Sequence, residues 1–572
     1  MQAEVTPYGD SAFLIEVDSV ADAHRLATVI ERERSSGAAP AGVGETVVGY
    51  GNVVVHLDPL TVPPESTEQW LAALALQLEN GAPSPASRSP HDHRHVDIPV
   101  TFDGADLEAV ATMVRATPPE VVELLTAAEL TVAFIGFAPG FPYLVGLPAA
   151  LASVPRRSSP RTSVPRGSLA IGGGFASVYP ESTPGGWMLL GRTEMRLFDP
   201  TRAPYALLSP GDTVRFSERP AEPGPTVIGA GSRAGSPSPP PPPTDSRGRE
   251  RLVNRGDRFA EILDAGLLSM IEDGGRRSVA ALGIPRAGPA DPEAMRLANR
   301  LVGNADDDAA IEITAAGPRL RFHGDAHVAV VAAGDGVDVS LDGHAVVGGV
   351  VVPVHSGQVV AVGHVRTALR AYLAVGGGFD PPVIVGSRSS DLLTGLGPGP
   401  LGVGDRLDLG TPSRPHGFLR HSADPTLPGR QHRVRVLSGP HRFPPAQWDR
   451  LVSHPWLVGE ASNRIGIRLT AQDHSDGTDS DPIPSAGMVN GAIQIPPDGN
   501  PIILMPDHAT VGGYPVIACV IAADLSILGR LRPGDSLVLA AVDRSAAFRA
   551  WIQSERKLDQ RVSGWFPTAT AT

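Results

Sequence analysis

The stretch Leu169-Ala170-Ile171-Gly172-Gly173-Gly174-Phe175 is nearly repeated as Leu373-Ala374-Val375-Gly376-Gly377-Gly378-Phe379. In both copies, three apolar residues lead into three glycines and a phenylalanine. Glycine adopts backbone conformations that a Cβ atom forbids, so each triplet predicts a tight turn at the end of a strand. A seven-residue match of this kind predicts that the chain contains related structural modules.

A Gly-Asp turn followed by an alternating strand comes after each copy, and a third occurs near the C-terminus. These turns begin at Gly211, Gly404 and Gly534. Short alternating strands separated by Gly and Pro turns are typical of antiparallel barrels or sandwiches. We therefore expect a mainly β (α+β) protein with three related barrel modules, the last two in tandem, at residues 96–220, 255–411 and 432–545.

Residues 1–80 have the mixed periodicity of a small α/β domain. Strand patterns cover Ser11–Val17 and Val53–Leu57, and helical spacing covers Val20–Arg34 and Glu68–Leu78. The side chain of Asp18 or Ser19 is the expected N-cap of the first helix.

Residues 221–254 form a tract of proline, serine and glycine that includes Pro239–Pro243. Such a composition cannot build a packed core and predicts an extended linker. It divides the chain into two halves, each of which could exist as a separate polypeptide.

Several classes of protein are excluded by composition. The net charge of the 572 residues is −13, which argues against a general binder of nucleic acids or anionic membranes. Lys557 is the only lysine, so the chain has no Walker A lysine, no Schiff-base lysine and no biotin attachment site. The single cysteine, Cys519, and the absence of a signal-like N-terminus predict a cytoplasmic protein.

The densest special sequence is Gly136-Phe137-Ala138-Pro139-Gly140-Phe141-Pro142-Tyr143-Leu144, followed later by Thr183-Pro184-Gly185-Gly186-Trp187. Glycine and proline among aromatic residues specify rigid, irregular loops, where binding sites are often built. Tight turns between barrel strands are the alternative for each piece. We select Phe137, Pro139, Gly140, Phe141, Gly185, Gly186 and Trp187 as substrate-binding candidates.

Arginine is the only abundant cation, and a guanidinium can bind a carboxylate or phosphate in a bidentate manner. Arg161, Arg192, Arg276 and Arg464 lie among glycines and prolines, although structural salt bridges would explain them equally well. The matching acids are Asp273, Asp291, Glu312 and Asp507. The runs His91–His95 and Asp473–Asp481 lack the spacing of a metal site, so we expect no metal.

Ordered motifs over nearly the whole chain resemble a known family. Residues 1–220 resemble the KipI type, which is the B component of 5-oxoprolinase, through Gly9-Asp10-Ser11, Gly136–Leu147 and Pro184-Gly185-Gly186-Trp187. Residues 260–545 resemble the KipA type, which is the C component. The motifs there are Gly283-Ile284-Pro285, Ala298–Asn304, Gly386-Ser387-Arg388-Ser389, Ser462-Asn463-Arg464 and Gly512-Gly513-Tyr514-Pro515. The chain thus looks like a fusion of the B and C components.

The resemblance implies cyclophilin-like barrels and ATP-dependent opening of 5-oxo-L-proline to L-glutamate. It also implies a separate A component of the LamB/YcsF type, and ATP, with Mg²⁺, bound mainly by that partner. Asp273, Arg276, Arg464 and Asp507 are then the catalytic candidates. Arg161, Arg192, Asn304, Glu312, Gln494, Thr510, Gly512, Gly513 and Tyr514 join the loop residues as substrate-binding candidates. We expect this site between the Gly136–Leu147 loop and the C-half barrels. The two halves are expected to pair within the chain, and the resemblance is also compatible with a homo-oligomer.

Three positions depart from the family pattern: Leu125 stands where a histidine is usual, Ala509 where glutamine is usual, and Glu272 where glutamine is usual. Two other functions therefore stay open. The modules also resemble the carboxyltransferase component of biotin-dependent urea carboxylases, which would need a biotinylated partner. A Kip-type pair could instead regulate a sensor histidine kinase without turnover.

Overall fold

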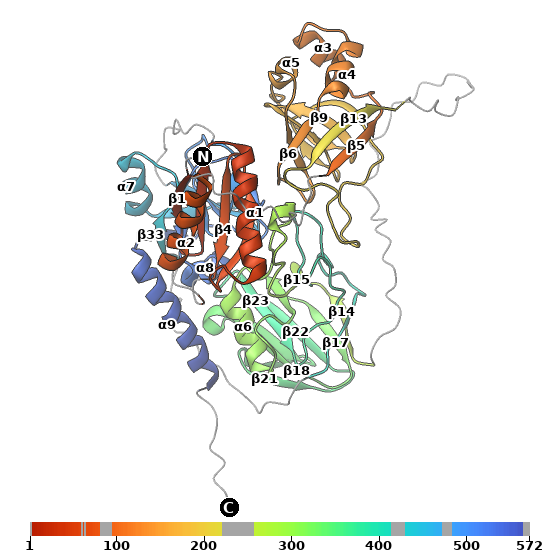
Figure 1. The fold of residues 1–572 in the computed structure, drawn as a ribbon. Coiled ribbons are helices and arrows are strands. Elements are labelled where there is room, and N and C mark those ends of the chain that lie inside the picture. The colour runs from red at the N-terminus through yellow and green to blue at the C-terminus, as the bar shows by residue number, and fades with distance from the viewer. Residues whose placement is uncertain are drawn as a thin grey trace, which may run out of the picture.

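The computed structural model describes residues 3–58, 61, 64–79, 94–219, 257–412, 430–471 and 483–563. The linker expected at 221–254 and the runs at 91–93 and 473–481 lie outside these residues. Strands predominate, which confirms the mainly β class. In Figure 1 the N-terminal domain lies beside the last module, the first barrel stands above them, and the second module lies below.

The N-terminal domain is a four-stranded antiparallel sheet, order β1-β2-β4-β3, with helices on one side. Its elements are β1 (Ala3–Tyr8), β2 (Ala12–Val17), α1 (Val20–Ser36), β3 (Val43–Val48), β4 (Asn52–Leu57) and α2 (Pro64–Glu79). The Ser19 hydroxyl accepts the Asp22 N–H at the start of α1, so Ser19 is the cap and not Asp18. Strands β1 and β3 were not predicted, because Pro7 and the Gly44-Glu45-Thr46 run obscure their alternation.

The first barrel is a seven-stranded sheet, order β12-β9-β10-β7-β6-β13-β5. An isolated bridge between Thr101 and Arg192 joins its two edges, so the barrel is nearly closed. Its elements are β5 (His95–Val100), α3 (Leu107–Met113), α4 (Pro118–Ala127), β6 (Leu130–Ile135), β7 (Pro142–Val145), α5 (Ala149–Ala152), β8 (Arg161–Val164), β9 (Ser168–Gly172), β10 (Phe175–Val178), β11 (Thr183–Gly185), β12 (Met188–Arg192) and β13 (Thr213–Glu218).

The second module differs from the barrel that we expected, because its strands form two separate sheets around one core. The sheets have the orders β20-β19-β22-β17-β14-β24 and β15-β16-β23-β18-β21. Its elements are β14 (Phe259–Asp264), β15 (Leu268–Glu272), η1 (Ala280–Leu282), α6 (Pro292–Leu301), β16 (Ala310–Thr314), β17 (Arg319–His323), β18 (Ala326–Ala332), η2 (Ala333–Asp335), β19 (Val337–Leu341), β20 (His344–Val346), β21 (Val351–Val354), β22 (Val359–Val365), β23 (Arg370–Val375) and β24 (Arg406–Asp408).

The third module is a closed barrel, order β25-β32-β29-β30-β27-β26-β33. Its elements are β25 (Gln431–Ser438), α7 (Pro445–Ser453), β26 (Trp456–Val458), β27 (Gly466–Ala471), β28 (Ala486–Gly487), β29 (Ala492–Gln494), β30 (Ile502–Leu504), β31 (Val511–Gly512), β32 (Val516–Val520), η3 (Ala522–Asp524), α8 (Leu525–Arg530), β33 (Ser536–Ala541) and α9 (Arg544–Ser563). None of the described helices combines the length and the apolar character needed to span a membrane.

The repeated sequence motifs have a structural basis. In each Gly-Asp turn the aspartate accepts the backbone N–H three residues earlier: Asp212 from Ser209, Asp405 from Gly402 and Asp535 from Arg532. In the first and third modules the strand after the turn pairs in parallel with the first strand of the module, β13 with β5 and β33 with β25. In the second module β24 instead pairs antiparallel with β14, so the same turn leads into a different closure.

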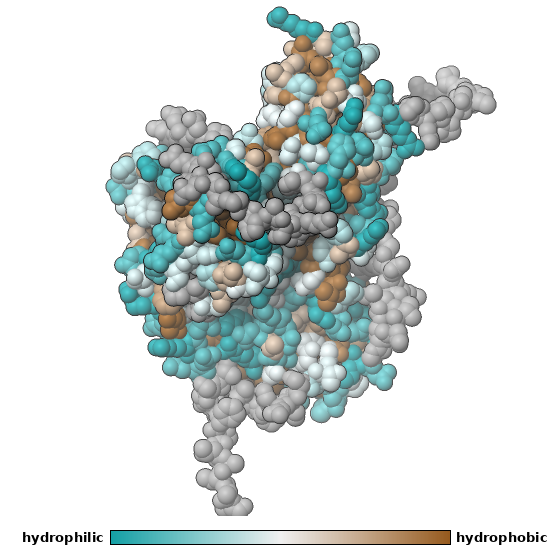
Figure 2. Space-filling view, viewed as in Figure 1, coloured by the Kyte–Doolittle hydropathy of each residue, from teal (hydrophilic) through white to brown (hydrophobic). Residues whose placement is uncertain are grey.

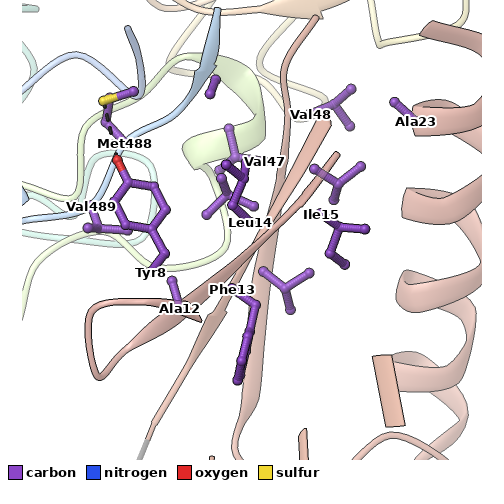
Figure 3. Close-up of a cluster of buried hydrophobic side chains, with 14 of the residues drawn as sticks. Tyr8, Ala12, Phe13, Leu14, Ile15, Ala23, Val47, Val48, Met488 and Val489 are labelled. Carbon is purple, nitrogen blue, oxygen red and sulfur yellow. Dashed lines mark hydrogen bonds between the residues drawn. The ribbon is translucent and has the colours of Figure 1, made fainter. Parts of the chain in front are cut away.

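The N-terminal domain packs on the third barrel, far away in sequence. Its core contains Tyr8, Phe13 and Leu14 together with Met488 and Cys519 of that barrel. Figure 3 shows the Tyr8 hydroxyl directed at the Met488 sulfur, 3.6 Å away. The two halves therefore share a hydrophobic core.

A close backbone approach strengthens this interface. Tyr50 N–H donates to Ser485 O at 2.7 Å. A Cβ atom on Gly487 would lie only 2.9 Å from the Cβ of Val54, so glycine is required there. On the face shown in Figure 2, hydrophilic side chains predominate and hydrophobic ones form small groups, as expected when large apolar surfaces are buried between modules.

The same interface contains a titratable group, Asp10, in the β1–β2 turn. Its Oδ2 atom accepts the Ala522 N–H at 2.9 Å, and burial is the largest cause that raises the pKa of this carboxyl from 3.8 to about 6. The protonated form is thus favoured in the folded protein. Its contribution to stability is complete below about pH 4 and is lost as the pH rises through 6.

We expect Asp10→Asn to remove this loss, which corresponds to about 3 kcal/mol for a shift of about two pKa units. The asparagine oxygen can still accept the Ala522 N–H but cannot ionise. Thermal unfolding from pH 4 to 7 tests this: the wild type should lose stability relative to the variant between pH 4 and 6. Parallel curves over that range would contradict it.

Candidate active site

The glycine-rich loop of the first barrel reaches the second module at η1. Gly140 N–H donates to Leu282 O at 2.8 Å, and a Cβ on Gly283 would lie 2.5 Å from Ala138 O. Phe137 has φ +67°, and 40 % of its surface is exposed. The loop therefore lies where we expected it, against the C-half modules.

Aromatic side chains hold this loop rigidly. Phe141 is buried, with ring centroids 5.1 Å from Tyr179 and 5.6 Å from Trp187 in edge-to-face contacts. Such contacts stabilise specific geometries. Phe141 and Trp187 are thus buried and support the loop from the core of the first barrel, whereas Phe137 is exposed at the loop surface.

The segment Thr510–Tyr514 lies against the same loop. A Cβ on Gly136 would be 2.7 Å from the Val511 side chain. Gln494 Nε2 donates to Tyr514 O at 3.4 Å and lies 3.2 Å from the Met488 sulfur. Tyr514 is 42 % exposed, so this segment presents an aromatic surface beside the junction.

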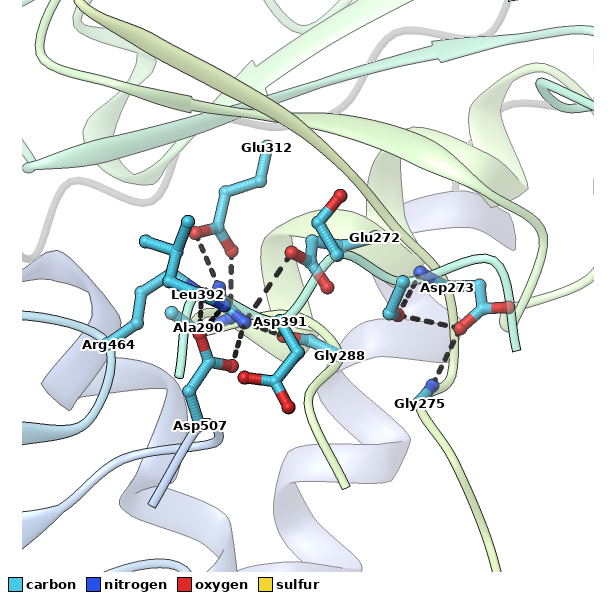
Figure 4. Close-up of polar contacts among 12 residues, drawn as sticks. Glu272, Asp273, Gly275, Gly288, Ala290, Glu312, Asp391, Leu392, Arg464 and Asp507 are labelled. Carbon is cyan, nitrogen blue, oxygen red and sulfur yellow. Dashed lines mark hydrogen bonds and ion pairs between the residues drawn. The ribbon is translucent and has the colours of Figure 1, made fainter. Parts of the chain in front are cut away.

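Arg464 is the centre of a buried ion-pair network that joins the second and third modules. Its guanidinium donates to both oxygens of Asp507, at 2.9 and 2.8 Å, and to Glu312 Oε1 at 2.7 Å. It also donates to Gly288 O at 2.7 Å and lies 3.5 Å from Glu272 Oε1 (Figure 4). Arg464 is 2 % exposed, and Glu312 and Asp507 are no more accessible.

Glu312 is the best-satisfied acid of this network. It accepts hydrogen bonds from Tyr372 Oη at 2.6 Å, Arg370 Nε at 3.1 Å and Ala290 N–H at 2.9 Å, besides Arg464. Burial would raise its pKa, but Arg464 and Arg370 lower it to about 2. Glu312 is therefore ionised at neutral pH.

Glu272 has the opposite character. Among the described residues, neither of its carboxyl oxygens accepts a hydrogen bond, because the nearby Ser389 hydroxyl donates to Asp273. Burial is the largest cause that raises its pKa well above the usual range, and the charges of Glu312 and Asp507 add to this. Burial therefore favours the neutral form of Glu272, which resembles the amide that the family resemblance leads us to expect at this position.

Asp273 organises the adjacent loop. It accepts hydrogen bonds from the hydroxyls of Ser387 and Ser389, at 2.5 and 2.7 Å, and from the N–H groups of Arg388 and Gly275, at 2.6 and 2.9 Å. Burial opposes ionisation, but these bonds lower its pKa overall. The carboxylate thus accepts hydrogen bonds mainly from the Ser387–Ser389 segment and also from Gly275 of its own loop (Figure 4).

Arg276 and Asp391 complete the buried polar group. Arg276 donates from Nη2 to Ser389 O at 2.6 Å, while its Nε and Nη1 have no hydrogen bond among the described residues. Burial and the Asp507 charge raise the pKa of Asp391 to about 6. Asp391 begins a turn whose next residue, Leu392, donates its N–H to Asp507 Oδ2 at 3.4 Å.

Four other titratable side chains belong to the Ala280–Gly288 segment or lie near it: Arg286 is in the segment, Glu45 accepts from it, and His56 and His508 interact with Arg286 and with each other in turn. Ala280 N–H donates to Glu45 Oε2 at 2.9 Å, and Ala287 N–H donates to Pro506 O at 3.1 Å, so the segment bridges the N-terminal domain and the third barrel. Burial and Arg286 lower the pKa of His56 to about 4, and burial also lowers the pKa of His508 to about 4. Both imidazoles are therefore neutral at pH 7.

Three other predicted residues make contacts within their own modules, whereas a fourth, Asp291, joins the second module to the third. Asn304 donates to Val375 O and accepts the Gly377 N–H, which ties α6 to the second glycine triplet. Arg192 pairs with Asp103 at 2.9 Å on the surface, and Arg161 pairs with Asp106 at 2.8 Å. Asp291 caps α6 and pairs with Arg530.

The remaining candidates shape the backbone. Gly185 lies against the Tyr179 side chain, and Gly186 O accepts the Arg157 N–H. Gly513 O accepts the Ile483 N–H, and Gly512 lies against Gln494. Leu125 is fully buried in the core of the first barrel, so the first departure from the family pattern is a packing position.

Sequence analysis missed Glu45, His56, Arg286, Asp391 and His508 and did not select Glu272 as a site residue. No motif surrounds His56 or Glu45, which belong to strands of a different domain. A signal did exist for Arg286 and His508, because they adjoin the motif residues Gly283–Pro285 and Asp507.

Two family models match the chain. The first, carboxyltransferase domain, subdomain C and D, covers residues 3–208, and the second, carboxyltransferase domain, subdomain A and B, covers residues 282–541. Together they extend over both halves.

Curated relatives match each half separately. The C half is similar to the C component of 5-oxoprolinase from Escherichia coli K12, 36 % identical over 305 residues, or 52 % of this chain and 96 % of that protein. The B half is similar to the B component of 5-oxoprolinase from Escherichia coli O157:H7, 42 % identical over 182 residues, or 30 % of this chain and 77 % of that protein.

A solved structure, that of TTHA0988, matches nearly the whole chain. The TM-score is 0.76 at 30 % identity, with 92 % of this chain and 99 % of that one covered. The similarity therefore includes the order of the modules. The chain belongs to the family of the B and C components of 5-oxoprolinase, with a B half followed by a C half in one polypeptide.

Proposed function

We propose that the chain supplies the B and C components of a cytoplasmic, ATP-dependent 5-oxoprolinase that opens 5-oxo-L-proline to L-glutamate with a separate A component of the LamB/YcsF type. The observation that carries this proposal is the junction of the halves, where the Gly136–Phe141 loop of the B half docks on η1 of the C half. Both relatives named as components of this enzyme match in that order.

In the proposed reaction, ATP transfers its γ-phosphoryl group to the amide carbonyl oxygen and ADP leaves. Water then adds to the carbonyl carbon, the C–N bond breaks, the nitrogen takes a proton, and inorganic phosphate leaves. Such chemistry needs positive charge or dipoles at the oxygen and an acid for the nitrogen.

The described residues offer both kinds of group. The pKa of Asp391 is raised to about 6, so this carboxyl is protonated only in part near neutral pH, and burial raises the pKa of Glu272 and favours its neutral form. Arg276 retains two nitrogens without hydrogen bonds, and the exposed Arg286 faces the junction. Asp507 and Arg464 are bound to each other, so we assign them the role of positioning this polar group.

The test is glutamate release from 5-oxo-L-proline and ATP by the purified chain, with and without its cognate LamB/YcsF-type protein. We expect turnover only in the mixture, with phosphate and glutamate formed in equal amounts. No glutamate from the mixture of two well-folded proteins would overturn the proposal.

The names of the family models favour a second candidate, a carboxyltransferase that accepts the carboxyl group of carboxybiotin. Biotin would have to come on a partner, because Lys557 is the only lysine. Carboxylation of urea or another amide by carboxybiotin, in a mixture that releases no glutamate, would favour this function.

A further inference from the structure

An unpaired cation, Arg286, lies at the junction of the two halves. Its side chain is exposed, although protein surrounds most of it, and it makes no hydrogen bond or ion pair with any described residue. Its neighbour Arg277, in contrast, pairs with Asp307 at 2.8 Å. Arg286 is distinguished by its position, because a guanidinium without a described partner lies where the two halves meet, and such a group can bind a carboxylate in a bidentate manner.

The backbone around Arg286 is fixed on both sides. Arg276 N–H donates to Arg286 O at 2.6 Å, and the next residue, Ala287, donates to Pro506 O at 3.1 Å. Three residues earlier, Gly283 contacts the Gly136–Phe141 loop. The backbone at Arg286 is thus fixed by contacts with the second module, the third barrel and, through Gly283, the B-half loop.

Strained backbone conformations are concentrated at this junction. Seven described residues other than glycine have positive φ, and four of them lie on the meeting segments: Phe137, Ser278, Ala287 and Val385. Val385 packs against Ile284 in a small hydrophobic cluster. Residues kept in such conformations cluster at binding sites, where the surrounding structure compensates for their cost.

Arg286 makes no ion pair with the described charged groups near it: the carboxylates of Glu45, Asp307 and Asp58 and the Arg277 cation act on it only through longer-range charge interactions. Glu45 accepts the Ala280 N–H, and burial raises the pKa of its carboxyl. His56 and His508 are neutral at pH 7, and the Nε2 atom of His56 has no hydrogen bond among the described residues. Burial and Arg277 lower the pKa of Arg286 itself, so an anion would relieve unfavourable interactions there.

We propose that Arg286, beside His56, binds the carboxylate of the small-molecule substrate. This assignment rests on the proposed function for the identity of the substrate, 5-oxo-L-proline. The guanidinium forms two parallel N–H···O hydrogen bonds with the carboxylate.

Binding to the full chain tests the proposal without turnover. Isothermal titration compares 5-oxo-L-proline with 2-pyrrolidinone, the same ring without its carboxylate, for the wild type and Arg286→Gln. We expect the substitution to weaken 5-oxo-L-proline about 10- to 100-fold, the range for hydrogen bonds to a charged group, and to leave 2-pyrrolidinone unchanged. Arg277→Gln is the matched control and should change neither affinity by more than about threefold.

A second measurement uses the imidazole signals of His56 in NMR spectra. Arg286→Gln should raise the pKa of His56, because it removes a neighbouring positive charge, and should abolish the shifts caused by 5-oxo-L-proline. Acetate and inorganic phosphate are titrated in parallel, so that a site for other anions is also detected. A site that binds only these two would overturn the assignment to substrate, as would shifts that persist in Arg286→Gln.

The results separate this inference from the proposed function. Carboxylate binding that depends on Arg286, without glutamate release, would retain the site and reject the oxoprolinase reaction. Normal turnover with an unchanged KM in Arg286→Gln would retain the reaction and reject the site. If Arg277→Gln weakened the binding of 5-oxo-L-proline as much as Arg286→Gln does, the loss of affinity would be due to net charge alone. That result would also reject the site.

Discussion

Replacing Arg464 by methionine is expected to destabilise the C half by more than about 3 kcal/mol, which corresponds to a fall in Tm of about 6–12 °C for a unit of this size. The substitution preserves side-chain length but leaves Asp507 and Glu312 buried without their shared cation. Removing one partner of a buried ion pair costs more than the pair itself contributes, because the remaining charge cannot be solvated. Scanning calorimetry of the full chain measures the change.

Two further variants define the cause. Arg464→Lys retains the charge but cannot donate to Asp507, Glu312 and Gly288 O at once, so we expect an intermediate Tm. Arg192→Met removes an arginine whose pair with Asp103 is on the surface, with 63 % and 44 % of the two side chains exposed, and should change stability by less than about 0.5 kcal/mol. An Arg464→Met protein as stable as Arg192→Met would show that the buried network contributes nothing.

Gly283→Ala is expected to reduce glutamate release at least about 10-fold by displacing the B-half loop, since small misplacements in a site can cost this much or more. Gly283 has φ +74°, and its new Cβ would lie 2.5 Å from Ala138 O and 3.4 Å from the Gly136 Cα. Backbone atoms cannot yield as a flexible side chain can, so the loop must move away from η1. Initial rates with the LamB/YcsF-type partner measure the effect.

The matched control is Gly343→Ala, because Gly343 has φ +82° but nothing within 4 Å of its new Cβ. Both variants bear the cost of a left-handed alanine, about 1–2 kcal/mol, and only Gly283→Ala adds the clash. Hydrogen exchange at the Gly140 N–H, which donates to Leu282 O, gives a readout independent of turnover and should accelerate only in Gly283→Ala. Equal rates of turnover and exchange in the two variants would place the site elsewhere.

Much of the fold could be predicted from local sequence. The helix beginning after Ser19 and the strands ending at Val17 and Leu57 follow from side-chain periodicity and a cap. The glycine triplets form turns because Gly173, Gly174, Gly377 and Gly378 all have positive φ. The Gly-Asp turns recur in three modules because one aspartate side chain satisfies a backbone donor three residues earlier in each. These effects act within a few residues, so a pattern in the chain suffices to reveal them.

The closure of the modules was harder to predict. The same Gly-Asp turn leads into a parallel strand pair in two modules and into an antiparallel one in the second, where two sheets form instead of a barrel. The identity of the neighbouring strand depends on the whole path of the chain and leaves no local signature.

The composition of the candidate site depended entirely on packing. Arg464 and Glu312 are 152 positions apart, yet they lie 2.7 Å from each other in a region without solvent. Glu272 and Asp273 are neighbours in the chain, but burial raises the pKa of the first, which accepts no hydrogen bond from a described residue, whereas the second accepts several. Residue type and spacing thus identified the family, the strands and the turns, because those rest on short-range sterics and hydrogen bonds. Which charges are buried, paired or left facing the junction followed only from the docking of distant segments, because solvation and Coulomb interactions depend on what surrounds a group in space.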